Sequence, residues 1–360
     1  MSALELGDFL PDLQLVNQRG RVTTISHRML GKAGVLLVYP DHDKPACQEL
    51  LRSFVAAYPR LEAVAHLFAV TAETPEANAA KAQRLGLPVP YILSDPEGRA
   101  AAALGVAHNA ADGSDFLGSG AFSVFVTDAG RRLIRVERGV TDPGFAAELA
   151  DFLEGQPSRE SRLMGPTAPV LYIPRVLEPA DCARLIEIYE TRGNQASGAL
   201  TEGADGRGAE RFDDKVKIRR DHNLRDPEVM AQIGRRLERR VVPEIFKAFF
   251  YRATYHEPLK LACYEGSDQG FFAPHRDNVT GNSAHRRFAM TLNLNAGDYE
   301  GGALRFPEYG PELYAPATGD AVIFSCSLLH EATPVTKGKR FALLTFLYGE
   351  DGRREQQRRA

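Results

Sequence analysis

Three residues in the last third of the chain have the types and spacing of a metal-binding set. His275 and Asp277 lie one residue apart, and His330 follows further along the chain. On a β-strand, residues i and i+2 point to the same side, so His275 and Asp277 can reach one ion together. Two histidines and one carboxylate form the facial triad of non-haem iron, which leaves metal positions open for a cosubstrate and O₂. The sequence therefore predicts these three side chains as Fe(II) ligands and as the catalytic centre.

A basic residue beyond the third ligand predicts how an anionic cosubstrate is held. Arg340 follows His330 by ten residues. Its guanidinium is permanently charged and fork-shaped, which suits bidentate binding of a carboxylate. We expect Arg340 to bind the far carboxylate of 2-oxoglutarate. The alternative is a surface position in a basic turn beside Lys337 and Lys339.

Because a His-x-Asp pattern alone is also typical of a surface turn, the motifs around it decide between the two interpretations. The run from His330 to Leu343, the segments Tyr264-Glu265-Gly266 and Phe272 to Asp277, and the turn Glu300-Gly301-Gly302-Ala303-Leu304 are informative together. They resemble the prolyl-4-hydroxylase-like 2-oxoglutarate oxygenases over most of residues 168–350.

This resemblance implies several site residues and cofactors. It gives His275, Asp277, His330 and Arg340 the roles described above, and it makes Tyr264 a contact of the cosubstrate. The loop from Tyr264 to His275 is about two residues longer than in the family. Thr291 and Asn293 share a strand face with positions that line the cosubstrate pocket in relatives, although polar residues facing solvent explain them equally well. The implied cofactors are Fe(II), 2-oxoglutarate as cosubstrate, O₂, and ascorbate as the reductant in vitro.

The chemistry implied by the resemblance is oxidation of an unactivated C–H bond, with release of succinate and CO₂. Related halogenases keep a small residue at the position of Asp277, so that a halide can bind the metal. A carboxylate there favours hydroxylation or another oxidation, although the sequence leaves open whether the product is hydroxylated, desaturated or cyclised. The expected substrate is a small molecule, an amino acid or a peptidyl residue.

The first half of the chain resembles a different family, the peroxiredoxins. The segments Leu6 to Leu13, Tyr39 to Cys47 and Leu93 to Gly98 carry this resemblance, which places Cys47 at the peroxidatic position. The family has Thr or Ser where this chain has Lys44, and arginine where it has Phe122. No second cysteine of this half could act as a resolving thiol. We expect this domain to have lost peroxidase activity and to serve in homodimerisation or substrate docking.

The pattern of apolar residues predicts two domains of different class. Short apolar runs such as 34–39 alternate with helical patterns such as 46–58, which indicates an α/β, thioredoxin-like domain over residues 1–156. A linker rich in polar residues, Pro and Gly is expected over 157–168. Helical patterns from Pro179 and Pro227 then precede many short strands. They indicate an α+β domain over 169–350 with a double-stranded β-helix (jelly-roll, cupin-like), followed by a frayed polar tail over 351–360.

Composition limits the partners and the compartment. A formal net charge of -3 gives no footprint for nucleic acid. No apolar run is long enough for a membrane span, and the start of the chain lacks the profile of a signal peptide. Four scattered cysteines show neither metal-type nor disulfide-type spacing, so a cytoplasmic protein is expected. Two other functions stay open: a thiol peroxidase using Cys47, and a catalytically silent binding module that holds metal structurally.

Overall fold

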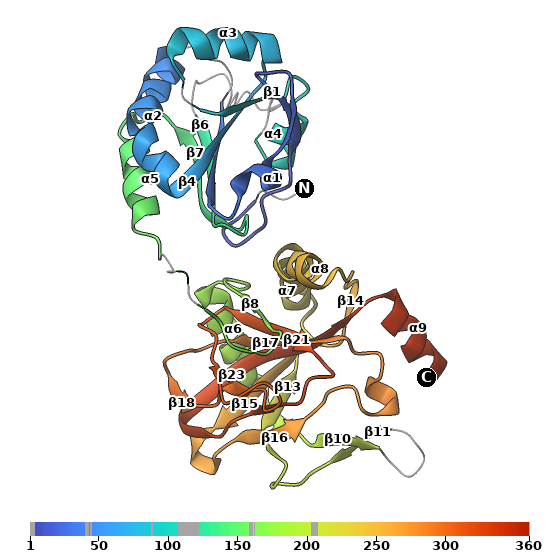
Figure 1. Ribbon diagram of the computed structural model, residues 1–360. Helices are drawn as coiled ribbons and strands as arrows, with labels where there is room; N and C mark the ends of the chain where they lie inside the picture. The colour runs from blue at the N-terminus through green and yellow to red at the C-terminus, as the bar shows by residue number, and fades with distance from the viewer. Residues whose placement is uncertain are drawn as a thin grey trace. The chain divides into compact units, whose positions relative to one another are not determined.

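The computed structural model describes residues 4–39, 43, 45–87, 89–106, 122–157, 161, 163–202 and 208–359. The chain divides into two compact units, Met1–Ser161 and Arg162–Ala360 (Figure 1). Each unit has buried apolar clusters of its own. The expected domain limits and linker remain a prediction in their detail. Among the described residues, no helix is both long and apolar enough to cross a membrane.

In the described part of the first unit, seven strands form one sheet with helices on both faces (Figure 1). The strand order is β2-β1-β5-β4-β3-β6-β7, and β3, β4 and β5 run parallel. Helices α2 and α5 contribute to the apolar cluster on one face, and α1 and α4 to the cluster on the other. The elements are β1 Gln14–Asn17, β2 Val22–Thr24, α1 Ile25–Met29, β3 Ala33–Val38, α2 Pro45–Val64, β4 Ala65–Thr71, α3 Pro75–Leu85, β5 Tyr91–Ser94, α4 Arg99–Ala103, β6 Phe122–Thr127, β7 Leu133–Val140 and α5 Phe145–Glu154.

The expected α/β, thioredoxin-like class is confirmed for this unit. The apolar run of β3 is buried because its strand lies in the middle of the sheet, where both faces are covered. Helix α2 begins at Pro45 and ends at Val64, so it is longer than the pattern over 46–58 indicated.

Two larger sheets and the two-stranded sheet β10-β11 form the described part of the second unit. The larger follows the order β8-β21-β17-β23-β15-β13-β9, and the smaller follows β12-β16-β22-β19-β20. Every strand pair recorded in them is antiparallel, which is the jelly-roll arrangement expected from the sequence. The described strands are β8 Leu171–Ile173, β9 Gln195–Ala196, β10 Ala199–Glu202, β11 Gly208–Arg211, β12 Lys217–Ile218, β13 Arg220–Asn223, β14 Tyr255–His256, β15 Lys260–Glu265, β16 Phe271–His275, β17 Phe288–Asn293, β18 Tyr299–Gly301, β19 Leu304–Arg305, β20 Leu313–Tyr314, β21 Ala321–Ser325, β22 His330–Ala332 and β23 Val335–Tyr348.

Helices α6 (Pro179–Thr191), α7 (Pro227–Arg240) and α8 (Val242–Phe249) pack against the larger sheet and form the main apolar core with it. Helix α7 begins as its sequence predicts. The Asp226 side chain accepts hydrogen bonds from the backbone N–H groups of Glu228 and Val229, and Pro227 occupies the first helical position. Two short 3₁₀ turns, η1 (Gly266–Asp268) and η2 (Gly281–Ser283), flank the strand β16.

The C-terminal segment corrects one expectation. Residues 351–360 were expected to be a frayed polar tail, but helix α9 covers Glu350–Arg359. Tyr251 donates a hydrogen bond to Asp351, and Arg287 forms an ion pair with the same carboxylate at 2.8 Å. Charge composition alone did not reveal this helix, because its polar side chains find partners on other elements of the unit.

Candidate metal centre

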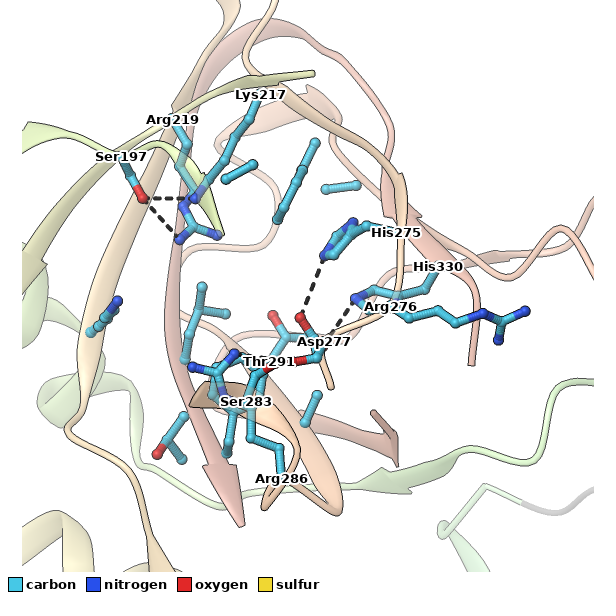
Figure 2. A pocket seen from close by; sticks show the side chains of 18 of the residues that line it. Ser197, Lys217, Arg219, His275, Arg276, Asp277, Ser283, Arg286, Thr291 and His330 are labelled. Carbon is cyan, nitrogen blue, oxygen red and sulfur yellow. Dashed lines mark hydrogen bonds and ion pairs between the residues drawn. The ribbon is translucent and has the colours of Figure 1, made fainter. Parts of the chain in front are cut away.

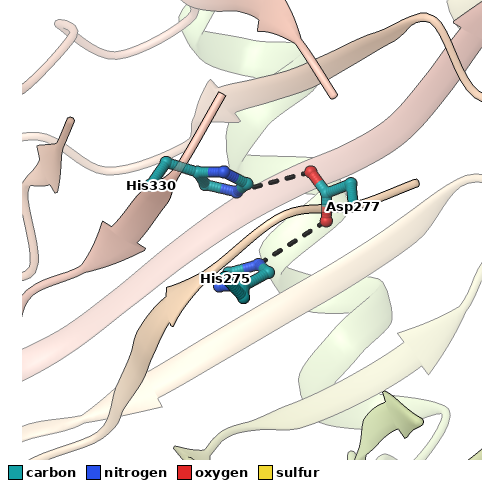
Figure 3. Close-up of side chains that lie close together, drawn as sticks. All are labelled: His275, Asp277 and His330. Carbon is teal, nitrogen blue, oxygen red and sulfur yellow. Dashed lines mark ion pairs between the residues drawn. The ribbon is translucent and has the colours of Figure 1, made fainter. Parts of the chain in front are cut away.

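The two histidines of the predicted ligand set lie opposite each other on neighbouring strands. His275 ends β16 and His330 begins β22, and the two residues are partners in the antiparallel register. Asp277 lies in the turn two residues beyond the end of β16, and its backbone N–H donates to the carbonyl of Cys326 at 3.0 Å. Figure 3 shows the three side chains converging. One donor atom from each lies within 4.8 Å of the others, so the structure brings the predicted ligand set together.

Backbone carbonyls fix which ring nitrogen of each histidine faces the centre. His275 Nδ1 lies 2.8 Å from the carbonyl oxygen of Ala273, and His330 Nδ1 lies 3.0 Å from that of Leu328. A carbonyl oxygen can only accept, so each Nδ1 carries the proton and each Nε2 has a free lone pair. This is the arrangement in which metal-binding imidazoles are usually held.

The donor atoms also have a spacing that suits a small divalent cation. His275 Nε2 lies 3.5 Å from Asp277 Oδ1, and His330 Nε2 lies 3.3 Å from Asp277 Oδ2. Two ligands at right angles around an octahedral ion at about 2.1 Å would lie about 3 Å apart. Two imidazoles and one carboxylate on one side of such an ion match the donor chemistry of non-haem Fe(II).

The local electrostatics favour the protonation states that bind metal. Burial by itself raises the pKa of Asp277, but the imidazoles of His330 and His275 outweigh it and bring the pKa to about 2. Burial lowers the pKa of His330, which favours the neutral imidazole. An anionic carboxylate and neutral imidazoles are the forms that can ligate a cation.

The three donors lie in a cavity of about 450 Å³ that also contains Arg340 and Tyr264. Arg340 is 3% exposed, and its Nη2 lies 3.5 Å from the hydroxyl of Thr291. Its guanidinium carbon lies 5.2 Å from the centre of the Tyr264 ring. Among the described residues, no carboxylate forms an ion pair with Arg340. A buried guanidinium of this kind needs an anion, so the cavity can bind a carboxylate ligand here.

The structure explains why the turn Glu300-Gly301-Gly302 requires a glycine at position 302. Its φ is +64°, and a Cβ there would lie 2.8 Å from Cδ of Arg340 and 2.7 Å from a methyl group of Val335. A side chain at this position would therefore be strained and would displace Arg340.

Of the other three predicted cosubstrate contacts, Tyr264 and Thr291 line the cavity and Asn293 does not. Tyr264 is buried in the cavity wall, and its hydroxyl accepts a hydrogen bond from Arg219 Nη1 at 3.2 Å. Thr291 lines the cavity. Asn293 lies further along the same strand, where its Nδ2 donates to the carbonyl of Pro316 at 2.9 Å. It is not among the described residues that line the cavity, because the end of β17 packs against the turn before β21.

Sequence analysis missed two charged groups in the same cavity. One contains Lys217 and Arg219 beside Ser197 (Figure 2). The other is Arg286, which forms a bidentate pair with Glu257 at 2.6 and 2.9 Å. The high density of charged residues over 217–221 was a usable signal for the first group. It did not stand out, because charged runs are equally typical of a solvent-exposed segment.

In the first unit, Cys47 lies near the start of α2, as predicted, but its side chain is completely buried. Phe122 stacks on Tyr39 with ring centroids 4.6 Å apart. The position where peroxiredoxins have an arginine is therefore occupied by a packed aromatic ring. Lys44 lies outside the described residues.

A double-stranded β-helix with two histidines, a carboxylate and a buried arginine in one cavity defines the non-haem iron oxygenase class. Comparison with known proteins agrees. Residues 259–348 match the family model of the 2OG-Fe(II) oxygenase superfamily, and residues 6–133 match that of the AhpC/TSA family. The chain belongs to the 2OG-Fe(II) oxygenase superfamily and is a 2-oxoglutarate-dependent dioxygenase with a peroxiredoxin-like N-terminal domain.

Individual relatives each cover only part of this chain. A PKHD-type hydroxylase of Pseudomonas putida is 30% identical over 186 residues, which is 48% of this chain and 75% of the relative. One from Saccharophagus degradans is 40% identical over 103 residues, 25% of this chain and 45% of the relative. Among solved structures, a P. putida prolyl-4-hydroxylase has a TM-score of 0.38 at 18% identity, covering 51% of this chain and 93% of its own. Peroxidoxin BcpB of Mycobacterium tuberculosis also has a TM-score of 0.38, at 22% identity, covering 43% of this chain and 99% of its own.

Proposed function

We propose that the protein hydroxylates an unactivated C–H bond of an organic substrate. In this proposal His275, Asp277 and His330 hold Fe(II), and Arg340 binds the far carboxylate of 2-oxoglutarate. The overall reaction consumes the substrate, 2-oxoglutarate and O₂, and it yields the hydroxylated product, succinate and CO₂. Ascorbate would serve as the reductant in vitro.

One observation carries the proposal. A preorganised set of two imidazoles and one carboxylate shares a cavity with a buried arginine that has no carboxylate partner among the described residues. The cation would satisfy Asp277, and the dicarboxylate cosubstrate would satisfy Arg340. Neither ligand alone accounts for both features.

Bound iron would supply the activation of O₂ that is coupled to decarboxylation of 2-oxoglutarate and to oxidation of the substrate. The residues of the chain would bind the iron and the cosubstrate, orient the ligands and exclude water. The Phe272 ring stacks on His275 with centroids 3.5 Å apart, and the Phe324 ring lies 4.5 Å from that of His330. These apolar walls restrict both imidazoles and keep bulk water from the reacting atoms.

The test is succinate release by the purified full chain on addition of Fe(II), 2-oxoglutarate and ascorbate. Release that depends on both iron and 2-oxoglutarate would support the dioxygenase, and mass spectrometry of the products would show whether one oxygen atom has been added. A protein that binds metal tightly but releases no succinate would instead be the silent binding module.

The buried Cys47 and the packed ring of Phe122 support the proposal that the N-terminal domain is not a peroxidase. A thiolate must reach its substrate to act as a nucleophile, and burial prevents this. The domain would instead act in dimerisation or in substrate docking. Peroxide consumption that disappears in Cys47→Ser would favour the peroxidase, and a change of oligomeric state on deletion of residues 1–156 would favour dimerisation.

A further inference from the structure

The cavity lining contains a further buried cation, Lys217. Lys217 on β12 is 8% exposed, and its Nζ donates to the hydroxyl of Ser197 and to the carbonyl of Gly198, both at 2.7 Å. Figure 2 shows Lys217 and Arg219 both extending toward Ser197. Neither partner of Lys217 carries a charge, so these contacts orient the ammonium group without neutralising it.

Counted over the described residues, the charges that act on Lys217 leave an excess of one positive charge. Arg219 is already neutralised by Asp221, with both nitrogen–oxygen distances at 2.7 Å. Lys260 and Glu210 also act on Lys217, and their charges have opposite signs. Among the described residues no carboxylate forms an ion pair with Lys217. Burial, together with the charge of Arg219, lowers the pKa of Lys217 to about 7. A neighbouring anion would remove this penalty on the charged form.

The remaining buried cations of the cavity are accounted for. Arg286 is paired with Glu257, and Arg340 faces the space proposed for 2-oxoglutarate. Lys217 is thus a second buried cation, in the described lining, that has no carboxylate of its own. One cosubstrate cannot satisfy Lys217 if its far carboxylate is bound by Arg340 and its other end faces the metal donors.

Lys217 is also close to the metal donors. It is the register partner of Phe272, and its Nζ lies 4.8 Å from the centre of the Phe272 ring. The same ring stacks on His275. The Phe272 ring therefore separates Lys217 from His275, so a ligand bound by Lys217 would lie close to the proposed metal centre.

We propose that Lys217, oriented by Ser197, binds a carboxylate of the oxidised substrate, so that the substrate is a small organic acid or a peptide with a free C-terminus. This inference rests on the proposed hydroxylation of an organic substrate. One excess positive charge matches a carboxylate, whereas a phosphate monoester would leave a net negative charge in a buried site. The cavity volume of about 450 Å³ lies in the range of sites for small ligands.

The experiment measures binding by calorimetry to the full chain, with and without Mn(II) and 2-oxoglutarate. One arm uses the free L-amino acids and their carboxamides as probes, and the other uses short peptides and their C-terminal amides. The native protein should bind at least one acid about 30-fold or more tightly than its amide. Lys217→Met should abolish this preference, Lys217→Arg should restore part of it, and the affinity for 2-oxoglutarate should stay unchanged in both. The arm that shows the preference identifies the source of the carboxylate.

Lys337→Met is the matched control, because Lys337 is exposed and pairs with Glu300 on the surface. It should behave as the native protein. Equal binding of acid and amide by the native protein, in both arms, would overturn the inference. So would a preference that survives in Lys217→Met, or a parallel loss of Mn(II) affinity, which would make Lys217 a support of His275. If acid binding depends on Lys217 but the bound acid is not hydroxylated and no succinate is released, the proposed hydroxylation fails and the anion site stands.

Discussion

The Arg286 side chain binds the backbone carbonyl of Asp277, one of the three predicted metal ligands. Its Nη1 donates to the Asp277 carbonyl at 3.2 Å, while its Nε and Nη2 bind the two oxygens of Glu257. His285 Nε2 lies 2.9 Å from the same carboxylate, and the Arg286 guanidinium lies 3.8 Å from the centre of the Phe346 ring. The buried ion pair of Arg286 and Glu257 thus fixes the backbone of Asp277, which lies beyond the end of β16.

Arg286→Met should therefore weaken metal binding without touching a ligand. Loss of a group that orients a metal ligand typically costs about 10–100-fold in metal affinity. The substitution also leaves Glu257 buried without its partner, so the C-terminal domain should unfold more easily. Titration with Fe(II) under anaerobic conditions measures the first effect. Arg287→Met is the control, because the neighbouring arginine pairs with Asp351 instead. Equal metal affinities of the two variants would contradict this role of Arg286.

Replacement of a histidine of the centre should have a larger effect. His275→Ala or His330→Ala should abolish iron binding and succinate release, because two remaining donors cannot hold a facial site. His256→Ala serves as the control, since this histidine is exposed and its Nδ1 faces the carbonyl of Glu257. Full turnover in either cavity variant would disprove the assignment of the metal ligands.

Cys47 should be dispensable for the oxygenase. It is buried in the core of a separate compact unit. Cys47→Ser should therefore leave 2-oxoglutarate turnover nearly unchanged when succinate is measured. A loss beyond about tenfold, which is about 1.4 kcal/mol in the activation free energy, would show that the thiol takes part in oxygenase function.

The stability of the C-terminal domain should depend on pH through Lys217. Its pKa is about 7 in the folded protein and about 10.4 in an unfolded chain. Between these values the unfolded state binds more protons, so the free energy of unfolding rises with pH, by at most about 1.4 kcal/mol per pH unit. Urea unfolding of the native protein and Lys217→Met at pH 7, 8 and 9 isolates this contribution as a difference. A difference that stays constant across the three pH values would show that Lys217 is not perturbed.

Much of the fold and the centre of the site follow from local sequence patterns. The apolar run of β3 and the cap of α7 at Asp226 have physical causes within a few residues. His275 and Asp277 were recognisable from their one-residue separation, although the structure places Asp277 in the turn after β16 and not on the strand that the i, i+2 argument assumed. His330 could not be assigned as a ligand from its spacing alone, and the motif from His330 to Leu343 identified it.

The supporting residues could not be predicted, because their roles depend on pairings between distant segments. Glu257 meets Arg286 only when the strands close around the cavity. Lys217 is buried only because Ser197 and Phe272, from two other segments, cover it. For Asn293, period-two alternation left two positions open, and in the structure its side chain donates to the carbonyl of Pro316. Helix α9 was missed because its stability comes from partners elsewhere in the fold.

Arg340 gives the sharpest test of the cosubstrate site. Truncation of one partner of a buried, charge-assisted pair typically costs about 2–5 kcal/mol. Arg340→Ala should therefore raise the apparent KM for 2-oxoglutarate by about two orders of magnitude or more, while Fe(II) affinity changes little. Arg340→Lys should recover only part of the loss, because it keeps the charge and loses the fork.

The neighbouring Lys339 provides the matched control for this prediction. Its side chain is 52% exposed and lies 3.6 Å from the carboxylate of Glu265, whereas Arg340 points into the cavity from the next position of β23. Strand alternation thus separates two adjacent cations into one that can meet a buried ligand and one that meets solvent. Lys339→Ala should leave the KM for 2-oxoglutarate near the native value. If both alanine variants raised it equally, the effect would come from the general positive field of the strand, and Arg340 would lose its assignment as the carboxylate anchor.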